Sequence, residues 1–385
     1  MRSPEALRTL RSRRLFYFRF ALSMNWTDDL LLEHASRARG QLQLATYAIS
    51  LSQGSTITAR QIKVKTIKEY IYAIASFLAL FSGTDFRYDS PSDKTFGRFL
   101  APIYSDLERY ETVPDRREPD TPEMHAHSRQ LAAPLRKKDH RSKIPALVDG
   151  FEMATMAGFR LTEWAQPANK HSVHSFLRNH LAHPNITTRA LCPLDIRVET
   201  YSRRRFKGIQ ALLVPLEQVH KLWIKFRTQK NGHNGEERLF TRNPDSDGIC
   251  FVASCYRALQ RFKALMDLDP SLTEEHPLSG YWDGSSSSVR LVTATDIEDF
   301  MRSLAVTVHH FHPVKDKKEL QKWSSHSLRV GACVALHAMG FSPLDIQWLL
   351  RWRSMAFMAY LRNNAGLADR HHRALDKAAG MPFLF

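Results

Sequence analysis

The chain has few cysteines and no long apolar run. Only four cysteines occur among its 385 residues, and none forms a C-x-x-C pair. This scarcity argues against a disulfide framework and a structural zinc site, and it favours a reducing compartment. The longest mostly apolar stretch, residues 70–83, suits a core helix and is too short to cross a bilayer. We therefore expect a soluble protein that has no membrane partner.

Acidic residues are also scarce relative to basic ones. The chain has 39 Asp and Glu against 55 Lys and Arg, which gives a formal net charge of +16. A field of this sign attracts polyanions, and without a membrane these are nucleic acids. The sequence also lacks a P-loop and an acidic cluster of the kind that holds a catalytic metal.

The length implies about two domains. Residues 1–27 are rich in Arg and form a basic N-terminal arm, which could contact DNA, target the chain or be a disordered start. Residues 28–112 have helical patterns, and residues 113–144 are charged and contain prolines, as a linker would. Residues 145–385 mix helices with a few strands. The expected fold class is mainly α with a small antiparallel β element: an all-α N-terminal domain and an α+β second domain.

Several elements can be placed from their patterns. In the first domain, one helical stretch closes on Gly54 and Thr58 can cap the next. In the second, residues 189–200 and 208–217 read as strands, and residues 221–241 as two strands around a Gly/Asn turn. Helices are expected at 251–268 and from Thr295 onwards. Two basic clusters are candidate DNA contacts, although solvated faces are an alternative: Lys63, Lys65 and Lys68, and Arg136, Lys137 and Lys138.

The segment from 326 to 363 gathers unusual residues. His326 and Arg329 share a helix face, and Trp352 and Tyr360 follow after signals for two further short helices, Gly340 with Ser342-Pro343 and then Ser354. All four side chains can donate hydrogen bonds to phosphate oxygens, and a tyrosine oxygen beside a cation is also a nucleophile. Taken alone, the segment fits a catalytic site or ordinary surface and core residues equally well.

The run "HSLR", a Gly-bounded helix pair, "LLRWRS" and a Tyr together resemble the C-terminal signature of the tyrosine recombinase (phage integrase) family. An upstream stretch, "ATMAGFRLTEW", resembles the first box of the family and supplies Arg160 and Glu163. The family also needs a Lys in a β-hairpin between the boxes, and Lys230 lies beside the predicted turn, with Lys225 as an alternative. The resemblance covers residues 145–365 in the order of the family.

The resemblance implies site-specific DNA strand exchange through a 3′-phosphotyrosine intermediate. Tyr360 would be the nucleophile, and Arg160 and Arg329 would clamp the phosphate, helped by the N–H of Trp352. His326 would handle the Tyr proton, Lys230 would protonate the leaving 5′-oxygen, and Glu163 would orient Arg160 or His326. One ester replaces another, so neither ATP nor a metal is implied. The domain before the catalytic one would be a core-binding DNA clamp.

Two departures from the family pattern affect the nucleophile. Trp352 stands where most members have a second His, and the interval to Tyr360 is eight residues instead of the commoner nine. Because one residue turns a helical side chain by about 100°, the assignment depends on where Ser354 starts its helix. Tyr256 and Tyr281 are competing nucleophiles outside the box.

Other functions stay open. The chain could be a silent DNA-binding protein derived from a recombinase, or a relaxing topoisomerase of the IB type. His171, His174, His180 and His183 have a spacing that could ligate a metal, although a polar helix face or loop is the preferred interpretation, and no metal is expected. The expected partner is double-stranded DNA, with self-association as a tetramer on it, in whichever compartment holds that DNA. The apolar C-terminus "MPFLF" could dock on a neighbouring protomer or pack on its own chain.

Overall fold

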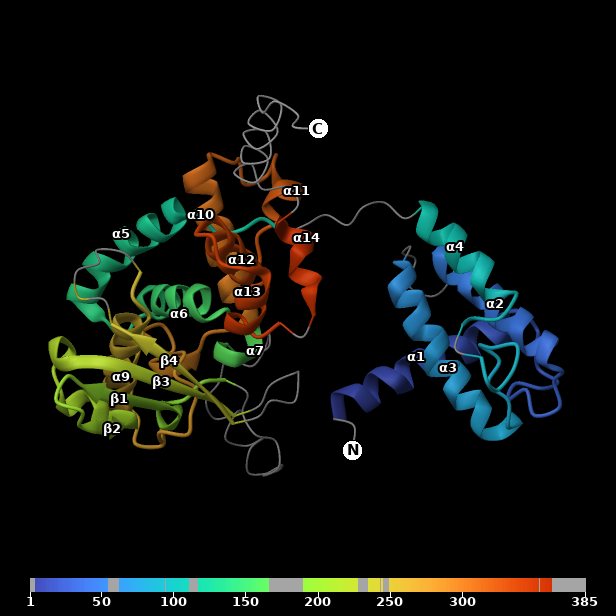
Figure 1. The fold of residues 1–385 in the computed structure, drawn as a ribbon, viewed down its shortest axis with the longest axis horizontal. Coiled ribbons are helices and arrows are strands. Elements are labelled where there is room, and N and C mark those ends of the chain that lie inside the picture. Colours follow the sequence, from blue (N-terminus) through green and yellow to red (C-terminus); the bar gives the residue numbers. More distant parts are fainter. Residues whose placement is uncertain are drawn as a thin grey trace, which may run out of the picture. The chain divides into compact units, whose positions relative to one another are not determined.

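The computed structural model describes residues 4–54, 62–93, 95–110, 117–165, 190–227, 235–242, 244, 249–352 and 354–361. Two compact units make up the chain, residues 1–114 and residues 115–385 (Figure 1). The described elements of the first unit are all helices, and the second unit combines helices with a small antiparallel sheet. The predicted fold class is therefore confirmed. None of the described helices is long and apolar enough to cross a membrane.

Four helices form the described part of the first unit: α1 (Pro4–Ser23), α2 (Arg37–Ser52), α3 (Val64–Ser82) and α4 (Leu100–Tyr110). Helix α3 is central, because Ile67, Ile71, Ile74 and Leu78 recur at helical spacing and are all buried. Helices α1, α2 and α4 pack on it or on each other around this stripe. Helix α3 ends at Gly83, whose left-handed φ of 66° suits a residue without a side chain.

The predicted N-terminal arm is largely a helix. In α1 most of the arginines come before the aromatic side chains, and Tyr17, Phe20 and Ala21 are buried in the core of the first unit. Arg13 pairs with Glu69 of α3 and lies over the ring of Tyr70. A disordered start is therefore wrong for Pro4–Ser23, since burial of these rings holds the segment in place. The predicted helix cap Thr58 lies outside the described residues, and α3 begins at Val64.

The second unit begins with helices, continues with the sheet and ends with helices. Its helices are α5 (Pro122–Asp139), α6 (Lys143–Ala157), α7 (Leu161–Trp164), α9 (Phe251–Leu268), α10 (Ala294–His309), α11 (Lys317–Leu320), α12 (Ser327–Ala338), α13 (Pro343–Leu349) and α14 (Met358–Leu361). Short 3-10 turns are η1 (Pro193–Asp195), η2 (Gly208–Leu213), η3 (Leu216–Gln218) and η4 (Met355–Phe357). Its strands are β1 (Ile196–Thr200), β2 (Arg205–Lys207), β3 (Val219–Phe226), β4 (Glu236–Thr241), β5 (Gly280–Asp283) and β6 (Ser288–Leu291).

Four strands form an antiparallel sheet in the order β2-β1-β3-β4, and β5 and β6 form a separate pair. The predicted strands at 189–200 and 221–241 are present as β1 and as the hairpin of β3 and β4. The predicted strand at 208–217 is wrong, since η2 and η3 occupy it. Gly208 has a left-handed φ of 60° and Pro215 has no N–H to donate to a neighbouring strand. The β5–β6 pair was not expected.

Helix α6 is the centre of the second unit. It is buried on nearly every side, α5, α9 and α12 pack on it, and α9 reaches the sheet through a ring stack of Phe251 on Phe240. The end of α6 and the short α7 carry the first box, residues 154–164, and α12 carries the start of the C-terminal signature, which we call the second box (Figure 1). Packing of α12 on α6 therefore brings the two boxes together.

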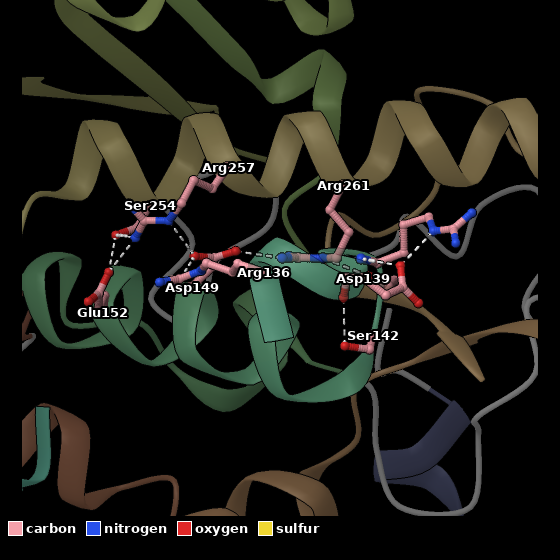
Figure 2. Close-up of polar contacts among 10 residues, drawn as sticks. Arg136, Asp139, Ser142, Asp149, Glu152, Ser254, Arg257 and Arg261 are labelled. Atoms are coloured by element: carbon pink, nitrogen blue, oxygen red, sulfur yellow. Dashed lines mark hydrogen bonds and ion pairs between the residues drawn. The ribbon is translucent and has the colours of Figure 1, made fainter. Parts of the chain in front are cut away.

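A buried charge network ties α5, α6 and α9 together (Figure 2). Asp149 of α6 accepts hydrogen bonds from Arg136 at 2.7 Å, from Arg257 at 2.8 Å and from Arg261 at 2.5 Å. Although burial alone would raise it, the pKa of Asp149 is held below its usual value by these three guanidinium groups. Arg257 also pairs with Glu152 at 2.7 Å.

This network corrects the predicted linker. Helix α5 occupies most of residues 113–144 and belongs to the second unit, because its Arg136 bonds to the buried Asp149. The sequence of α5 has few large apolar residues to indicate a packed helix, because charged side chains make much of its contact with the rest of the unit. Arg136 is thus engaged within the protein, whereas Lys137 and Lys138 are exposed.

Candidate active site

Helices α12, α13 and α14 form a small cluster that places His326 against Tyr360. Their buried apolar residues are Ala332, Cys333, Ile346, Leu350, Phe357 and Leu361. Ser342 caps α13 by accepting a hydrogen bond from the backbone N–H of Asp345, as its position before Pro343 predicts. In this arrangement Nε2 of His326 lies 2.8 Å from Oη of Tyr360, within hydrogen-bond distance. The two residues are 34 positions apart in sequence.

The eight-residue interval between Trp352 and Tyr360 is accommodated by a local turn. Ser354 has extended backbone and precedes the 3-10 turn η4, after which α14 carries Tyr360. Because a 3-10 turn advances fewer residues per turn than an α-helix, the shorter interval still points Tyr360 at His326. The rings of Trp352 and Tyr360 lie 6.1 Å apart.

The competing tyrosines lie elsewhere. Tyr256 of α9 is buried and donates its hydroxyl to the carbonyl oxygen of Val214 at 2.7 Å. Tyr281 of β5 is also buried, and burial raises its pKa to about 12. A buried hydroxyl that resists ionisation is a poor nucleophile. Of the three candidate tyrosines, Tyr360 is the one that contacts His326.

Arg329 is the most deeply held of the predicted site residues. Only 4% of it is exposed, and it donates to the carbonyl oxygens of Gly158, through Nη1, and of Leu350, through Nη2 at 2.9 Å. Its guanidinium lies over the ring of Trp352, with 4.6 Å to the ring centroid. Burial, and then the nearby charge of Arg160, lower the pKa of Arg329 to about 10, so it stays protonated at neutral pH.

Arg160 follows the left-handed turn at Gly158, where φ is 58°. Its backbone N–H donates to Oε2 of Glu163 at 2.8 Å, and its Nη1 donates to Oε1 of the same carboxylate at 2.9 Å. Its Nη2 donates to the backbone oxygen of Arg351 at 3.1 Å. The side chain remains 21% exposed, so the guanidinium is oriented by the protein and still reaches solvent.

Arg351 is a site residue that the sequence did not single out. Its side chain is 1% exposed and donates to both oxygens of Glu163, at 2.8 and 3.1 Å. Its φ of 56° is left-handed, which costs a non-glycine residue on the order of 1 kcal/mol or more. In the sequence, Arg351 is noticeable only as the neighbour of Trp352, and this position does not show that its side chain is buried.

Glu163 is buried between two guanidinium groups. Burial alone would raise its pKa, but Arg351 and then Arg160 hold the pKa of this carboxylate below its usual value. Glu163 therefore stays ionised at neutral pH. Of its two predicted partners, Arg160 and His326, Glu163 bonds to Arg160. No hydrogen bond between the side chains of Glu163 and His326 is present among the described residues.

His326 lies in a positive environment. Burial lowers its pKa, and so do the charges of Arg329 and Arg117, so that the imidazole is neutral at pH 7. Arg117, which the sequence did not indicate, is exposed and donates to the backbone oxygen of Gln321. A neutral imidazole with its proton on Nδ1 can accept the hydroxyl proton of Tyr360 through Nε2.

Trp352 closes the site beside these residues. Its ring centroid lies 6.2 Å from that of His326. The indole N–H is buried beside the thiol of Cys333 and finds no oxygen acceptor among the described residues. A thiol is a weak acceptor, so this N–H is only weakly satisfied within the protein.

The predicted general acid and the histidine cluster cannot be placed. Lys230, and His171, His174, His180 and His183, lie outside the described residues. Lys225, the alternative to Lys230, is exposed on β3 and pairs in register with Glu237 of β4. No group of three side chains suited to hold a metal occurs in the described part of the chain.

The predicted DNA contacts of the first unit differ in their surroundings. Lys63 and Lys65 are exposed at the start of α3. Lys68 instead bonds to Glu108 at 2.5 Å and lies 5.1 Å from the ring centroid of Tyr104. Its charge is therefore partly engaged within the unit, as that of Arg136 is in the second unit.

Comparisons with known proteins give structural likeness only. No family model and no curated protein matches the chain. The Tn1549 transposon integrase in complex with transposon right end DNA is 11% identical, with a TM-score of 0.41, over 88% of this chain and 85% of that one. The XerH site-specific recombinase bound to palindromic difH substrate, in a post-cleavage complex, is 10% identical, with a TM-score of 0.44, over 87% and 72%. The XerA recombinase is 14% identical, with a TM-score of 0.34, over 94% and 98%.

Proposed function

We propose that this protein is a tyrosine recombinase, which exchanges DNA strands at specific sites through a covalent 3′-phosphotyrosine intermediate. One observation carries the proposal: Oη of Tyr360 lies 2.8 Å from Nε2 of His326, beside the buried cation Arg329. A tyrosine hydroxyl in contact with a neutral base, with a guanidinium nearby, is what attack on a phosphodiester requires. Because the TM-scores lie below 0.5 and the identities at or below 14%, we base the function on these residues.

The first step is attack on the scissile phosphorus. His326 accepts the proton of Tyr360, and the phenolate oxygen forms a bond to phosphorus as the bond to the 5′-oxygen breaks. The product is a 3′-phosphotyrosine and a free 5′-hydroxyl. In the second step a 5′-hydroxyl of another strand attacks the same phosphorus, and the proton returns to Tyr360. One ester replaces another in each step, so we expect no requirement for ATP.

The positive residues stabilise the charge that builds up on the phosphate oxygens. Arg160, partly exposed and oriented by Glu163, can present two N–H groups in the fork that a phosphate accepts. Arg329 adds a second cation in a buried setting, where charge interactions are strong. We propose a further hydrogen bond to the phosphate from the indole N–H of Trp352, which in this structure is buried beside Cys333. Preorganised donors of this kind are typically the largest contribution to catalysis.

The leaving 5′-oxygen needs a general acid from the β3–β4 hairpin. Lys230 stays our proposal because it stands between β3 and β4 in the sequence, and Lys225, which lies on β3, is the alternative. The first unit would grip the duplex from its own side, through Lys63 and Lys65 at the start of α3. Lys137 and Lys138 would contact it from the second unit. Strand exchange between two duplexes further requires self-association on DNA, which we propose as a tetramer.

Capture of covalent adducts tests the proposal. A pool of nicked duplexes with a randomised central region would be incubated with the full chain. After denaturation, protein-linked DNA would be recovered, digested with protease and sequenced. We expect adducts enriched in a shared sequence, with a tyrosyl phosphate at residue 360. Tyr360→Phe should keep DNA affinity and lose the adduct, whereas the matched variant Tyr256→Phe should keep both.

The outcomes separate the alternative functions. Adducts without sequence enrichment, together with relaxation of any supercoiled plasmid, would indicate a topoisomerase of the IB type. DNA binding without any adduct would indicate a silent DNA-binding protein. An adduct that persists in Tyr360→Phe would place the nucleophile on another residue.

A further inference from the structure

Glu163 lies between two guanidinium groups that differ in their access to solvent. Arg160 contacts Oε1 at 2.9 Å and is 21% exposed, whereas Arg351 contacts Oε2 at 2.8 Å and is 1% exposed. One carboxylate cannot neutralise two cations, so this group of three keeps a net charge of +1. The buried Arg351 also donates to the carbonyl oxygens of Ala157 and Gly158.

The consequence concerns Arg160. If Glu163 faced Arg160 alone, the two would form a closed neutral pair, and the field of the carboxylate would oppose the approach of a phosphate. With Arg351 sharing the carboxylate, the excess positive charge falls on the partner that reaches solvent. We propose that Arg351 is a positioning residue, which shares Glu163 with Arg160 and so leaves a net positive charge on the side that faces the phosphate. The inference rests on the proposed function.

The backbone of Arg351 supports the same role. Its left-handed φ of 56° accompanies a carbonyl oxygen that accepts a hydrogen bond from Nη2 of Arg160 at 3.1 Å. The residue thus holds Arg160 twice, through its own carbonyl and through the shared carboxylate. A strained backbone persists only where surrounding contacts determine it, and here those contacts lead to Arg160.

Arg351 also reaches the base of the hairpin. Its guanidinium lies 3.6 Å from the ring centroid of Phe226, the last residue of β3. Lys230 follows this residue by four positions in the sequence and lies outside the described residues. A single buried side chain therefore contacts the carboxylate that orients Arg160 and the strand that leads to the proposed general acid.

A double-mutant cycle tests the charge sharing. The variants are Arg351→Met, Glu163→Gln and the two combined, each measured for adduct formation at saturating DNA and for DNA affinity in a Tyr360→Phe background. Arg351→Met should slow adduct formation on the order of 10²-fold, because Glu163 then neutralises Arg160. Adding Glu163→Gln should restore at least about tenfold of that loss, since a neutral amide no longer opposes the phosphate.

A role in packing alone predicts the reverse. If Arg351 only fills and stabilises the core, the double variant should be no faster than Arg351→Met, and this result would overturn the inference. If Arg351→Met does not fold, the adduct rate of the double variant alone tests the inference. This variant buries no unpaired charge, and rates within about tenfold of wild type support the inference, whereas a folded and DNA-binding but inactive double variant overturns it.

A matched pair controls for the loss of a buried ion pair. Arg257 and Glu152 are in contact at 2.7 Å in the same unit and lie in the separate network of Figure 2. Their cycle, Arg257→Met with Glu152→Gln, should change the midpoint of unfolding and leave the adduct rate of the folded protein unchanged. Failure of the proposed function is distinguishable, because the wild-type chain would then form no adduct. The affinity cycle in Tyr360→Phe would still test the charge sharing, and equal affinity of all variants would overturn it.

Discussion

The carbonyl oxygen of Gly158 accepts a hydrogen bond from Nη1 of Arg329, although the two residues are 171 positions apart. This contact joins the turn before Arg160 to the helix that begins after His326. The two arginines proposed to clamp the phosphate are therefore held by a common piece of backbone. Their relative position depends on the left-handed conformation at residue 158.

Gly158→Ala tests that dependence. An added Cβ would lie 2.7 Å from Cδ2 of Leu350, and the φ of 58° disfavours a side chain. We expect a loss of about 1–3 kcal/mol in the free energy of unfolding, measured with urea, and slower adduct formation. Gly340→Ala is the matched control, because its φ is 87° and no atom lies within 4 Å of its added Cβ. It should lower stability without slowing adduct formation of the folded protein.

Arg329→Lys should be far from conservative. A lysine keeps the charge, but it cannot donate to both carbonyl oxygens and to a phosphate in the same geometry. We expect adduct formation to fall on the order of 10²-fold or more. Arg302→Lys, on an exposed face of α10 where Arg302 pairs with Glu298, should leave the rate unchanged. Near-normal rates for Arg329→Lys would remove this residue from the site.

The rate of adduct formation should depend on the protonation of His326. Its pKa lies below the ordinary value of 6.5, and the neutral form is the base, so the rate should fall as pH drops through that lowered pKa. Arg117→Met removes a nearby charge that lowers the pKa, so the acidic limb should move to higher pH. An unchanged limb in that variant would mean that Arg117 does not act on His326.

The same shift has a consequence for stability. Because the folded pKa of His326 is lower than the unfolded value, the unfolded state binds the proton more readily between the two. This residue therefore contributes to a loss of stability as pH falls from about 6.5 toward the folded pKa, and the contribution levels off below it. The free energies of unfolding of the wild type and of His326→Gln, measured with urea and plotted against pH, should therefore diverge across this range. Parallel plots would contradict this contribution of His326.

The salt dependence of DNA affinity distinguishes lysines that contact DNA from a lysine that is paired within the protein. Lys63→Ala with Lys65→Ala should flatten the plot of log affinity against log salt by up to about two units, because each lost phosphate contact removes roughly one. Lys68→Ala should change the slope little, since this side chain bonds to Glu108. An unchanged slope in the first variant would mean that the exposed lysines of α3 face solvent in the complex.

The sequence predicted those parts of the structure that depend on local signals. The signals at Gly340 and Ser342 bound helices as expected, and β3 and β4 pair as the predicted hairpin. Arg160 and Arg329, which the resemblance places in one site, are near enough that the charge of Arg160 lowers the pKa of Arg329. Their catalytic roles, and that of Lys230, remain predictions.

Features that depend on tertiary contacts were not predictable. Helix α5 has few apolar residues and contains Pro134, and its attachment through Arg136 to Asp149 becomes visible only when α6 is in place. The inward turn of Arg351 depends on a carboxylate 188 positions earlier in the chain, Glu163. Residues 208–217 read as a strand from their apolar content, but their conformation is set by Gly208 and Pro215.

The long sequence separations within the site bear on when the chain becomes active during synthesis. Gly158 and Glu163 are made early, whereas Arg329 and Arg351 are made 171 and 188 residues later. Closing such long loops is slow and comes after local structure has formed. A nascent chain that has emerged only through β6 would thus have its sheet and α6, but neither the second arginine nor a tyrosine nucleophile. For the function proposed above, adduct formation would therefore require chains that have been translated and folded through residue 360.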